Sequence, residues 1–199
     1  DTVAKHHPMS ATHMGVKGFD HLMADYSPEA SEAFHSDVLS AMKEMQAAVP
    51  ANERERMCKD TFIDEISLSV EQYESREHLR DMNVLFSPVQ SVRSIFDLMP
   101  QDSVEAWENI ASRMEKIGGS LAGYRQTLDI GRSEGLVTSE RQVNGTAEQC
   151  EAWAGGGDNS PFFDSLVNAL ASSDINDDSL AARIEDAAAS ATEAYDEMG

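Results

Sequence analysis

The sequence predicts an all-α protein, a multi-helix array of long amphipathic helices. Apolar residues recur every three or four positions along several long segments, which places them on one face of a helix. Ser27-Pro28, Ser87-Pro88 and Ser160-Pro161 each combine an N-capping residue with a proline that suits the first helical position. The alternation of apolar and polar residues that is typical of strands does not extend beyond about four residues.

Two long helices are predicted in the first part of the chain. Ser27 caps the first helix and Pro50 ends it, and its apolar stripe is Phe34, Val38, Met42, Met45 and Val49. The second helix runs from about Asn52 to Leu79 with the stripe Cys58, Phe62, Ile66, Val70 and Tyr73. Because Cys58 lies on this stripe, we expect its thiol to pack in the core rather than to act as a nucleophile.

A short helix and a long helix are predicted in the middle of the chain. The short helix begins at Ser87-Pro88 and closes near Pro100. The long helix has Asp102 as its expected N-cap and Glu105 as the partner in a capping box. Its apolar positions are Val104, Trp107, Ile110, Ala111, Met114, Ile117, Leu121, Tyr124 and Leu128.

Glycines interrupt the pattern of this long helix. Gly118 and Gly119 weaken its middle, because each glycine costs about 1 kcal/mol relative to alanine, and we expect a kink or a close helix crossing there. Gly131 and Gly135 are candidate stop signals for the helix.

Two further helices are predicted near the C-terminus. The first starts at Ser160-Pro161 and carries Phe162, Phe163, Leu166, Val167 and Leu170 at helical spacing. The second is rich in alanine, is capped by Asp177 or Asp178, and extends through Tyr195. A glycine-rich linker precedes both helices, so the predicted division is residues 1–154, the linker 155–159, and an acidic helical hairpin or tail over 160–199.

The net charge limits the classes of partner. The chain has 36 acidic and 15 basic residues, so its net charge is -21. Nonspecific nucleic-acid binding and docking on anionic lipid both require clustered Lys and Arg, so neither is expected. No apolar run approaches the length of a membrane span, and two cysteines without a secretory leader favour free thiols and a cytoplasmic location, although a leader removed by processing stays possible.

Neither a metal site nor a catalytic constellation is expected within this chain. The six histidines lack the spacing of a helical zinc site, in which two His at i and i+4 flank a Glu. The carboxylates of residues 64–77 fit the solvated face of an amphipathic helix better than acid/base catalysis.

Two polar clusters are the candidate sites for substrate or interdomain contact. One joins two predicted helices and contains Arg80 and Asn83; the other, residues 123–135, contains Tyr124, Arg125 and Arg132. Arg125 and Arg132 are seven residues apart, so they share a helix face and could bind a carboxylate bidentately. A helix-terminal salt bridge or a partner interface is the favoured alternative.

Several motifs together resemble a bacterial family known as DUF885. Pro8–Gly15 resembles the P-x-x-A-T-x-x-G opening of that family, and Val137–Gln142 resembles its G-x-V-x-P-R-x-Q continuation, with Ser139-Glu140 in place of the usual proline step. Further similarities are Asp25–Pro28, Asn83–Pro88 and the G-x-x-x-G segment Gly131–Gly135. The resemblance covers most of residues 8–155.

The resemblance implies a function for a longer protein. Members of the family resemble zinc carboxypeptidases of the M32 type and other gluzincins, which are helical, have a long cleft between two halves, and carry an H-E-x-x-H type zinc helix in the C-terminal part. On this basis the chain is the N-terminal portion of such a metallopeptidase, supplies a cleft wall or lid, and is inactive alone. Zinc is expected in the parent protein, and the expected partners are the C-terminal part of the parent and a peptide substrate.

The alternative is a self-contained acidic module that binds a basic partner. Residues 145–199 hold 12 acids and one base, a net charge of -11, which would steer a basic partner toward them. Such a module would be monomeric and would lose affinity steeply with added salt. A fragment of a longer enzyme would instead leave an apolar face uncovered and tend to associate.

Overall fold

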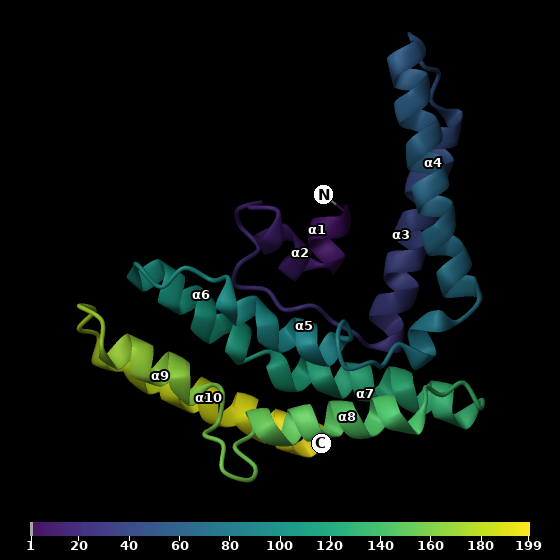
Figure 1. Ribbon diagram of the computed structural model, residues 1–199. Helices are drawn as coiled ribbons and strands as arrows, with labels where there is room; N and C mark the ends of the chain where they lie inside the picture. The colour runs from purple at the N-terminus through teal and green to yellow at the C-terminus, as the bar shows by residue number, and fades with distance from the viewer. Residues whose placement is uncertain (1) are drawn as a thin grey trace.

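The computed structural model describes residues 2–199, and every regular element in that range is a helix (Figure 1). The predicted all-α class is therefore confirmed. The elements are α1 (Thr2–His6), α2 (Pro8–His13), α3 (Pro28–Ala47), α4 (Glu53–Glu74), the 3-10 helix η1 (Glu77–Arg80), α5 (Pro88–Ser94), the 3-10 helix η2 (Ile95–Asp97), α6 (Val104–Met114), α7 (Ile117–Ser133), α8 (Glu140–Trp153), α9 (Asp164–Ala171) and α10 (Asp178–Met198).

The helices form a layered body and a projecting hairpin. Figure 1 shows α8, α9 and α10 in one tier, α5, α6 and α7 in the next, and α1 and α2 on the far side. The hairpin of α3 and α4 extends away from this body, and its two helices pack mainly on each other. None of the described side chains of α4 is buried, so most of the hairpin surface faces outward.

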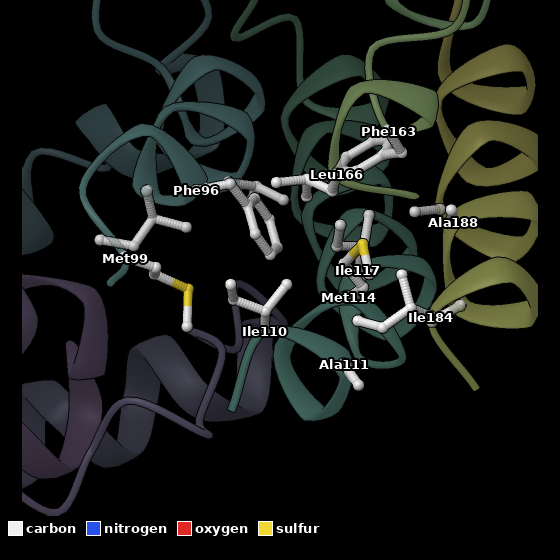
Figure 2. Packing of buried hydrophobic residues seen from close by; sticks show 14 of the residues in the cluster. Phe96, Met99, Ile110, Ala111, Met114, Ile117, Phe163, Leu166, Ile184 and Ala188 are labelled. Atoms are coloured by element: carbon white, nitrogen blue, oxygen red, sulfur yellow. The ribbon is translucent and has the colours of Figure 1, made fainter. Parts of the chain in front are cut away.

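One hydrophobic core lies between α10 and the middle tier. Figure 2 shows Ile184 and Ala188 of α10 facing Met114 and Ile117. Tyr195 is fully buried at the end of α10, and its hydroxyl donates a hydrogen bond to the carbonyl of Val89 at 2.9 Å. This core draws side chains from both sides of residues 155–159, and the division into two parts at that segment stays a prediction.

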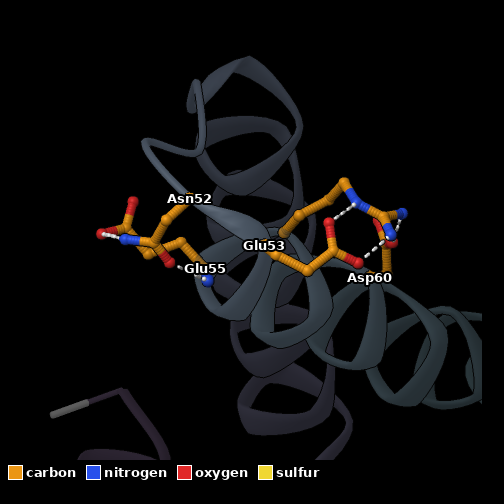
Figure 3. A network of polar contacts seen from close by, with 5 residues as sticks. Asn52, Glu53, Glu55 and Asp60 are labelled. Atoms are coloured by element: carbon orange, nitrogen blue, oxygen red, sulfur yellow. Dashed lines mark hydrogen bonds and ion pairs between the residues drawn. The ribbon is translucent and has the colours of Figure 1, made fainter.

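Most of the predicted helix starts agree with the structure. Ser27 caps α3 and accepts a hydrogen bond from the Ala30 amide, and Asp177 caps α10. Asn52 caps α4, where its side-chain oxygen accepts from the Glu55 amide at 3.0 Å (Figure 3). The Glu55 carboxylate in turn accepts from the Ala51 amide at 2.7 Å. These caps are local interactions, which is why the sequence alone predicts them.

The predicted long helix after Asp102 is wrong in two respects. It is broken at Glu115 and Lys116 into α6 and α7, and the glycine pair lies within α7 rather than at the break. Its N-cap is Ser103, whose hydroxyl accepts from the Ala106 amide at 3.2 Å. Beside the break, the Lys116 ammonium group donates hydrogen bonds to the carbonyls of Ser112 and His21. The bond to His21 is a tertiary contact at the point where α6 ends and α7 begins.

Three other predictions need correction. α4 ends at Glu74 rather than at Leu79, because Arg76 takes a left-handed conformation (φ 64°) and the chain continues as η1. Cys58 is exposed, so its place on the apolar stripe does not bring it into a core.

The helix predicted from Ser160-Pro161 starts only at Asp164, because the Phe162 amide bonds to the Trp153 carbonyl at 2.8 Å and holds a loop there. The sequence pattern also missed α1, α2 and α8.

A fully buried arginine fixes the segment that leads into α3. Arg113 donates from Nε to the Leu22 carbonyl at 2.8 Å and from Nη2 to the Phe19 carbonyl at 3.0 Å. Burial lowers the pKa of Arg113 to about 10, so its guanidinium stays charged at neutral pH. The charge-assisted bonds thereby tie the loop after α2 to the middle tier.

Small residues on one face of α7 permit close backbone contacts. A Cβ atom at Gly131 would lie 2.1 Å from the Leu79 carbonyl oxygen, so η1 can rest on α7 only because residue 131 is glycine. Gly131 therefore marks a packing contact inside the helix, which continues to Ser133.

We expect Gly131→Ala to lower the free energy of unfolding by about 1–3 kcal/mol, because the added methyl group overlaps backbone that must then shift. Gly119→Ala is the matched control in the same helix, since no described atom lies within 4 Å of its added Cβ. That control should raise the free energy of unfolding by up to about 1 kcal/mol. Urea titrations measure both, and equal effects of the two variants would contradict the packing role of Gly131.

Candidate functional site

A large cavity lies where the N-terminal helices, the base of the hairpin and α7 meet. Its volume is about 1240 Å³, and its walls come from α1, α3, α4, η1, the segment 81–83, α7 and the segment 137–139. These elements are distant in sequence, so only the tertiary fold brings them together.

Backbone contacts with α7 fix one wall of this cavity. Ser120 donates its hydroxyl to the Ala24 carbonyl at 2.7 Å, and Thr127 donates to the Tyr26 carbonyl at 2.7 Å. Between them, Gly123 leaves room for the chain at Ser27, whose amide would lie 2.9 Å from a Cβ at that position. Tyr26 is thereby held at the cavity wall.

A second part of the wall, at Asp81, is anchored by Tyr124. Its hydroxyl donates to the Asp81 carbonyl at 2.6 Å, and its ring lies edge-on to that of Tyr26 with centroids 6.2 Å apart. Burial, followed by the nearby Asp81 charge, raises the pKa of both tyrosines well above the ordinary value. Burial, followed by the Glu77 charge, raises the pKa of Asp81. Both phenols therefore stay protonated at neutral pH and can donate hydrogen bonds.

Stacked rings form the base of the hairpin. Tyr73 lies between His35 and His78, with ring centroids 4.0 Å and 4.5 Å away and interplanar angles of 14° and 2°. Burial, then the charges of Arg76 and His35, lower the pKa of His78. The stack connects α3, α4 and η1, and two of its rings, Tyr73 and His78, line the cavity.

The remaining edge is formed by α1 packed against α3. Phe34 contacts the rings of His6 and His7 at centroid distances of 5.4 Å and 4.6 Å. Asp37 accepts from His6 Nε2 at 2.8 Å and from Lys5 Nζ at 3.1 Å, and these two hydrogen bonds lower its pKa. Burial lowers the pKa of His7, which favours a neutral ring at the cavity edge.

Three of the sequence-predicted site residues meet at this cavity. Tyr124, Arg80 and Asn83 line it. Arg80 forms an ion pair with Glu77 at 2.5 Å, and the side-chain oxygen of Asn83 accepts from the amides of residues 85 and 86. These two side chains therefore shape the cavity wall through local contacts.

The predicted arginine pair is not assembled. Arg125 is directed to the end of α10, where it donates to the Glu197 carbonyl. Arg132 pairs with Asp129 of its own helix at 3.0 Å and its side chain is 79% exposed. Neither residue lines the cavity, and a contact of either one with substrate or with another part of a longer protein stays a prediction.

The sequence reasoning missed the ring-bearing residues of the cavity. His6, His7 and His78 lack the spacing of metal ligands, and nothing in that spacing indicates that they pack on Phe34 and Tyr73. No signal short of the tertiary fold would have joined these segments, although Phe34 and Tyr73 do fall on the predicted stripes.

The described residues do not form a metal centre. No group of three or more His, Cys, Asp or Glu side chains among residues 2–199 is placed to hold a metal ion. Burial raises the pKa of the Cys150 thiol to about 11, which does not suit a nucleophile. What the cavity offers is shape, aromatic surface and hydrogen-bonding groups, and these are the means of binding a ligand.

Comparison with known proteins places the chain in a family. The model of the family described as "Bacterial protein of unknown function (DUF885)" matches residues 8–199. The chain belongs to the DUF885 family. No curated protein matches its sequence.

A solved structure shares the fold. A "putative lipoprotein" from Colwellia psychrerythraea superposes with a TM-score of 0.78 over 99% of this chain, at 12% sequence identity. The match covers 38% of that protein, so this chain spans well under half of its length. Within residues 2–199, none of the helices combines the length and the apolar character that crossing a bilayer requires. The cytoplasmic location expected from the sequence stays a prediction, and the description of the Colwellia protein does not support it.

The ring stack predicts a pH dependence of stability. Because the pKa of His78 is lower in the folded chain than in the unfolded chain, the unfolded state binds more protons, and stability should fall as the pH drops below about 6.5. His78→Phe keeps a ring on Tyr73 but cannot be protonated. We expect the loss of thermal stability between pH 7.5 and 5.5 to be smaller in this variant than in the wild type.

The control is His13→Gln, at an exposed position outside the stack. Its loss of stability over the same pH range should match that of the wild type. A wild-type loss that His78→Phe leaves unchanged would show that the stack does not carry the pH dependence.

Proposed function

We propose that this chain forms one wall of the substrate cleft in a longer, zinc-dependent peptidase of the carboxypeptidase type. The observation that carries the proposal is the 1240 Å³ cavity, which is large enough for several residues of a peptide and is lined by tyrosines and hydroxyl groups. The DUF885 membership and the much longer Colwellia relative support the assignment to a longer protein.

The zinc ion is assigned to the remainder of the longer protein. The histidines at the cavity are held in ring contacts with Phe34 and Tyr73, and no described group of three ligands accompanies them. None of the described residues 2–199 is therefore proposed as a zinc ligand.

The contribution of this chain is to bind and orient the peptide. The phenol groups of Tyr26 and Tyr73 and the hydroxyls of Thr138 and Ser139 line the cavity and are of the type that bonds peptide carbonyls. The aromatic surface would also exclude water from the bound segment. Arg125 and Arg132, which lie outside the cavity, are assigned to contacts with the remainder of the protein rather than with the peptide.

A second candidate function is binding of a basic partner by the acidic C-terminal part. Arg183 is the sole basic residue of residues 145–199, and it is committed to Glu115, with bonds of 2.6 Å and 2.8 Å. The negative charges of residues 145–199 are therefore scarcely balanced by positive charges within that segment. This favours electrostatic attraction of a basic protein.

The peptidase proposal is tested on the longer protein that contains this chain. We expect that protein to bind zinc and to hydrolyse peptides, and Tyr124→Phe to reduce kcat/KM about tenfold, because it removes the hydrogen bond that holds Asp81 at the cavity wall. Arg54→Ala, at an exposed position on the hairpin, is the control and should leave kcat/KM unchanged. Absence of zinc and of hydrolysis would reject the proposal, and unchanged kcat/KM in Tyr124→Phe would reject the role of the cavity.

A further inference from the structure

The segment between η1 and α5 is held firmly by hydrogen bonds to two helices. The Val84 amide donates to Gln142 Oε1 at 2.9 Å, and Gln149 Nε2 donates to the Val84 carbonyl at 3.1 Å. Side chains of α8 therefore bond to both backbone groups of Val84. On the other flank, Tyr124 of α7 holds the Asp81 carbonyl at 2.6 Å.

The next turn of the same segment is fixed by its own side chains. The oxygen of Asn83 accepts from the amides of Leu85 and Phe86 at 2.9 Å and 2.8 Å. The Ser87 amide then donates to Gln90 Oε1 at 2.9 Å, at the start of α5. The amides of Leu85 and Phe86 are thereby paired, so the fold itself orders this turn and a partner need not do so on binding.

This ordered turn presents large apolar side chains to the outside. Phe86 is 83% exposed and Leu85 is 67% exposed. Gln142 of α8 bonds to the neighbouring Val84 amide, and close to Gln142 in the sequence Val137 is 59% exposed and Val143 is 42% exposed. We call these four residues the Phe86 patch. A rigid turn that displays a phenylalanine and a leucine has the properties of an interface anchor.

We propose that the Phe86 patch docks the part of the longer protein that this chain lacks. This docking rests on the proposed function, because it requires that the chain be one portion of a longer peptidase. The Colwellia relative contains this fold in 38% of its length, so most of that protein lies outside the matched region and is available to cover the patch. Asn83 and Val137 also line the cavity, which places the patch at its rim, where a second cleft wall would close on it.

A second copy of the chain is a poorer occupant. Each copy carries a net charge of -21, so two copies repel each other. Four apolar side chains also cover much less than the roughly 1,200 Å² that a stable interface between separate molecules buries. A covalently connected segment needs less area, because its effective concentration at the patch is high.

The test measures the accessibility of position 86 with a thiol-reactive maleimide. Phe86→Cys is made in a Cys58→Ser background, which removes the exposed native thiol, while Cys150 stays buried. We expect this cysteine to react rapidly in the 199-residue chain and at least about tenfold more slowly in the longer protein. Ser172→Cys, at an exposed polar position, is the matched control and should react at the same rate in both. Leu85→Cys provides a second probe of the patch.

The outcomes separate this proposal from the peptidase proposal, because labelling does not depend on hydrolysis. Protection in the longer protein supports docking even where no peptide is cleaved. Equal labelling rates in the two proteins overturn it, as does a reading frame that stops at Gly199. Protection that appears in the 199-residue chain alone and grows with its concentration would show that a second copy is the occupant, which also overturns the proposal.

Discussion

The arrangement of the cavity depends on one face of α7 that consists of small residues. Ser120, Gly123, Thr127 and Gly131 are spaced by three or four positions, so they form one continuous stripe along the helix. Two of them have no side chain, and the other two are short hydroxyl residues that bond to the carbonyls of Ala24 and Tyr26 at 2.7 Å. Larger side chains at Gly123 and Gly131 would overlap the neighbouring backbone and force it away from α7.

Two chain segments use this stripe, and each supplies one wall of the cavity. The segment before α3 brings Tyr26 against Thr127, and η1 brings Leu79 against Gly131, where its carbonyl would be only 2.1 Å from a Cβ atom. Because both walls are set by backbone contacts with a single helix, their separation is fixed before any ligand binds. The same contacts position the base of the α3–α4 hairpin, whose ring stack closes the cavity on the third side. A preformed site of this kind lowers the ordering cost of binding a ligand.

The parts of this fold that the sequence predicted are those with local causes. The predicted helix starts at Ser27, at about Asn52 and at Asp177 or Asp178 depend on residues within one turn, and in the structure Ser27, Asn52 and Asp177 are the N-caps. The end of α4 and the break between α6 and α7 coincide with tertiary contacts such as the bond from Lys116 to the His21 carbonyl, and no local pattern encodes them. Gly131 can be recognised in the sequence, but a glycine near the end of a helix predicts the end of that helix as readily as a close packing contact. For the candidate site, Tyr124, Arg80 and Asn83 were predicted from polar clusters, whereas the contacts of His6 and His7 with Phe34 join residues 28 and 27 positions apart and required the fold.

The most direct measurement is amide hydrogen exchange of the wild type and of Gly123→Ala. A methyl group at residue 123 would lie 2.9 Å from the Ser27 amide nitrogen, so the segment before α3 must move away from α7. If the small-residue stripe sets the cavity, exchange at residues 24–27 should accelerate strongly in the variant, while exchange in the core helix α10 stays as in the wild type. Unchanged exchange at residues 24–27 in a folded variant would contradict the central role of the stripe.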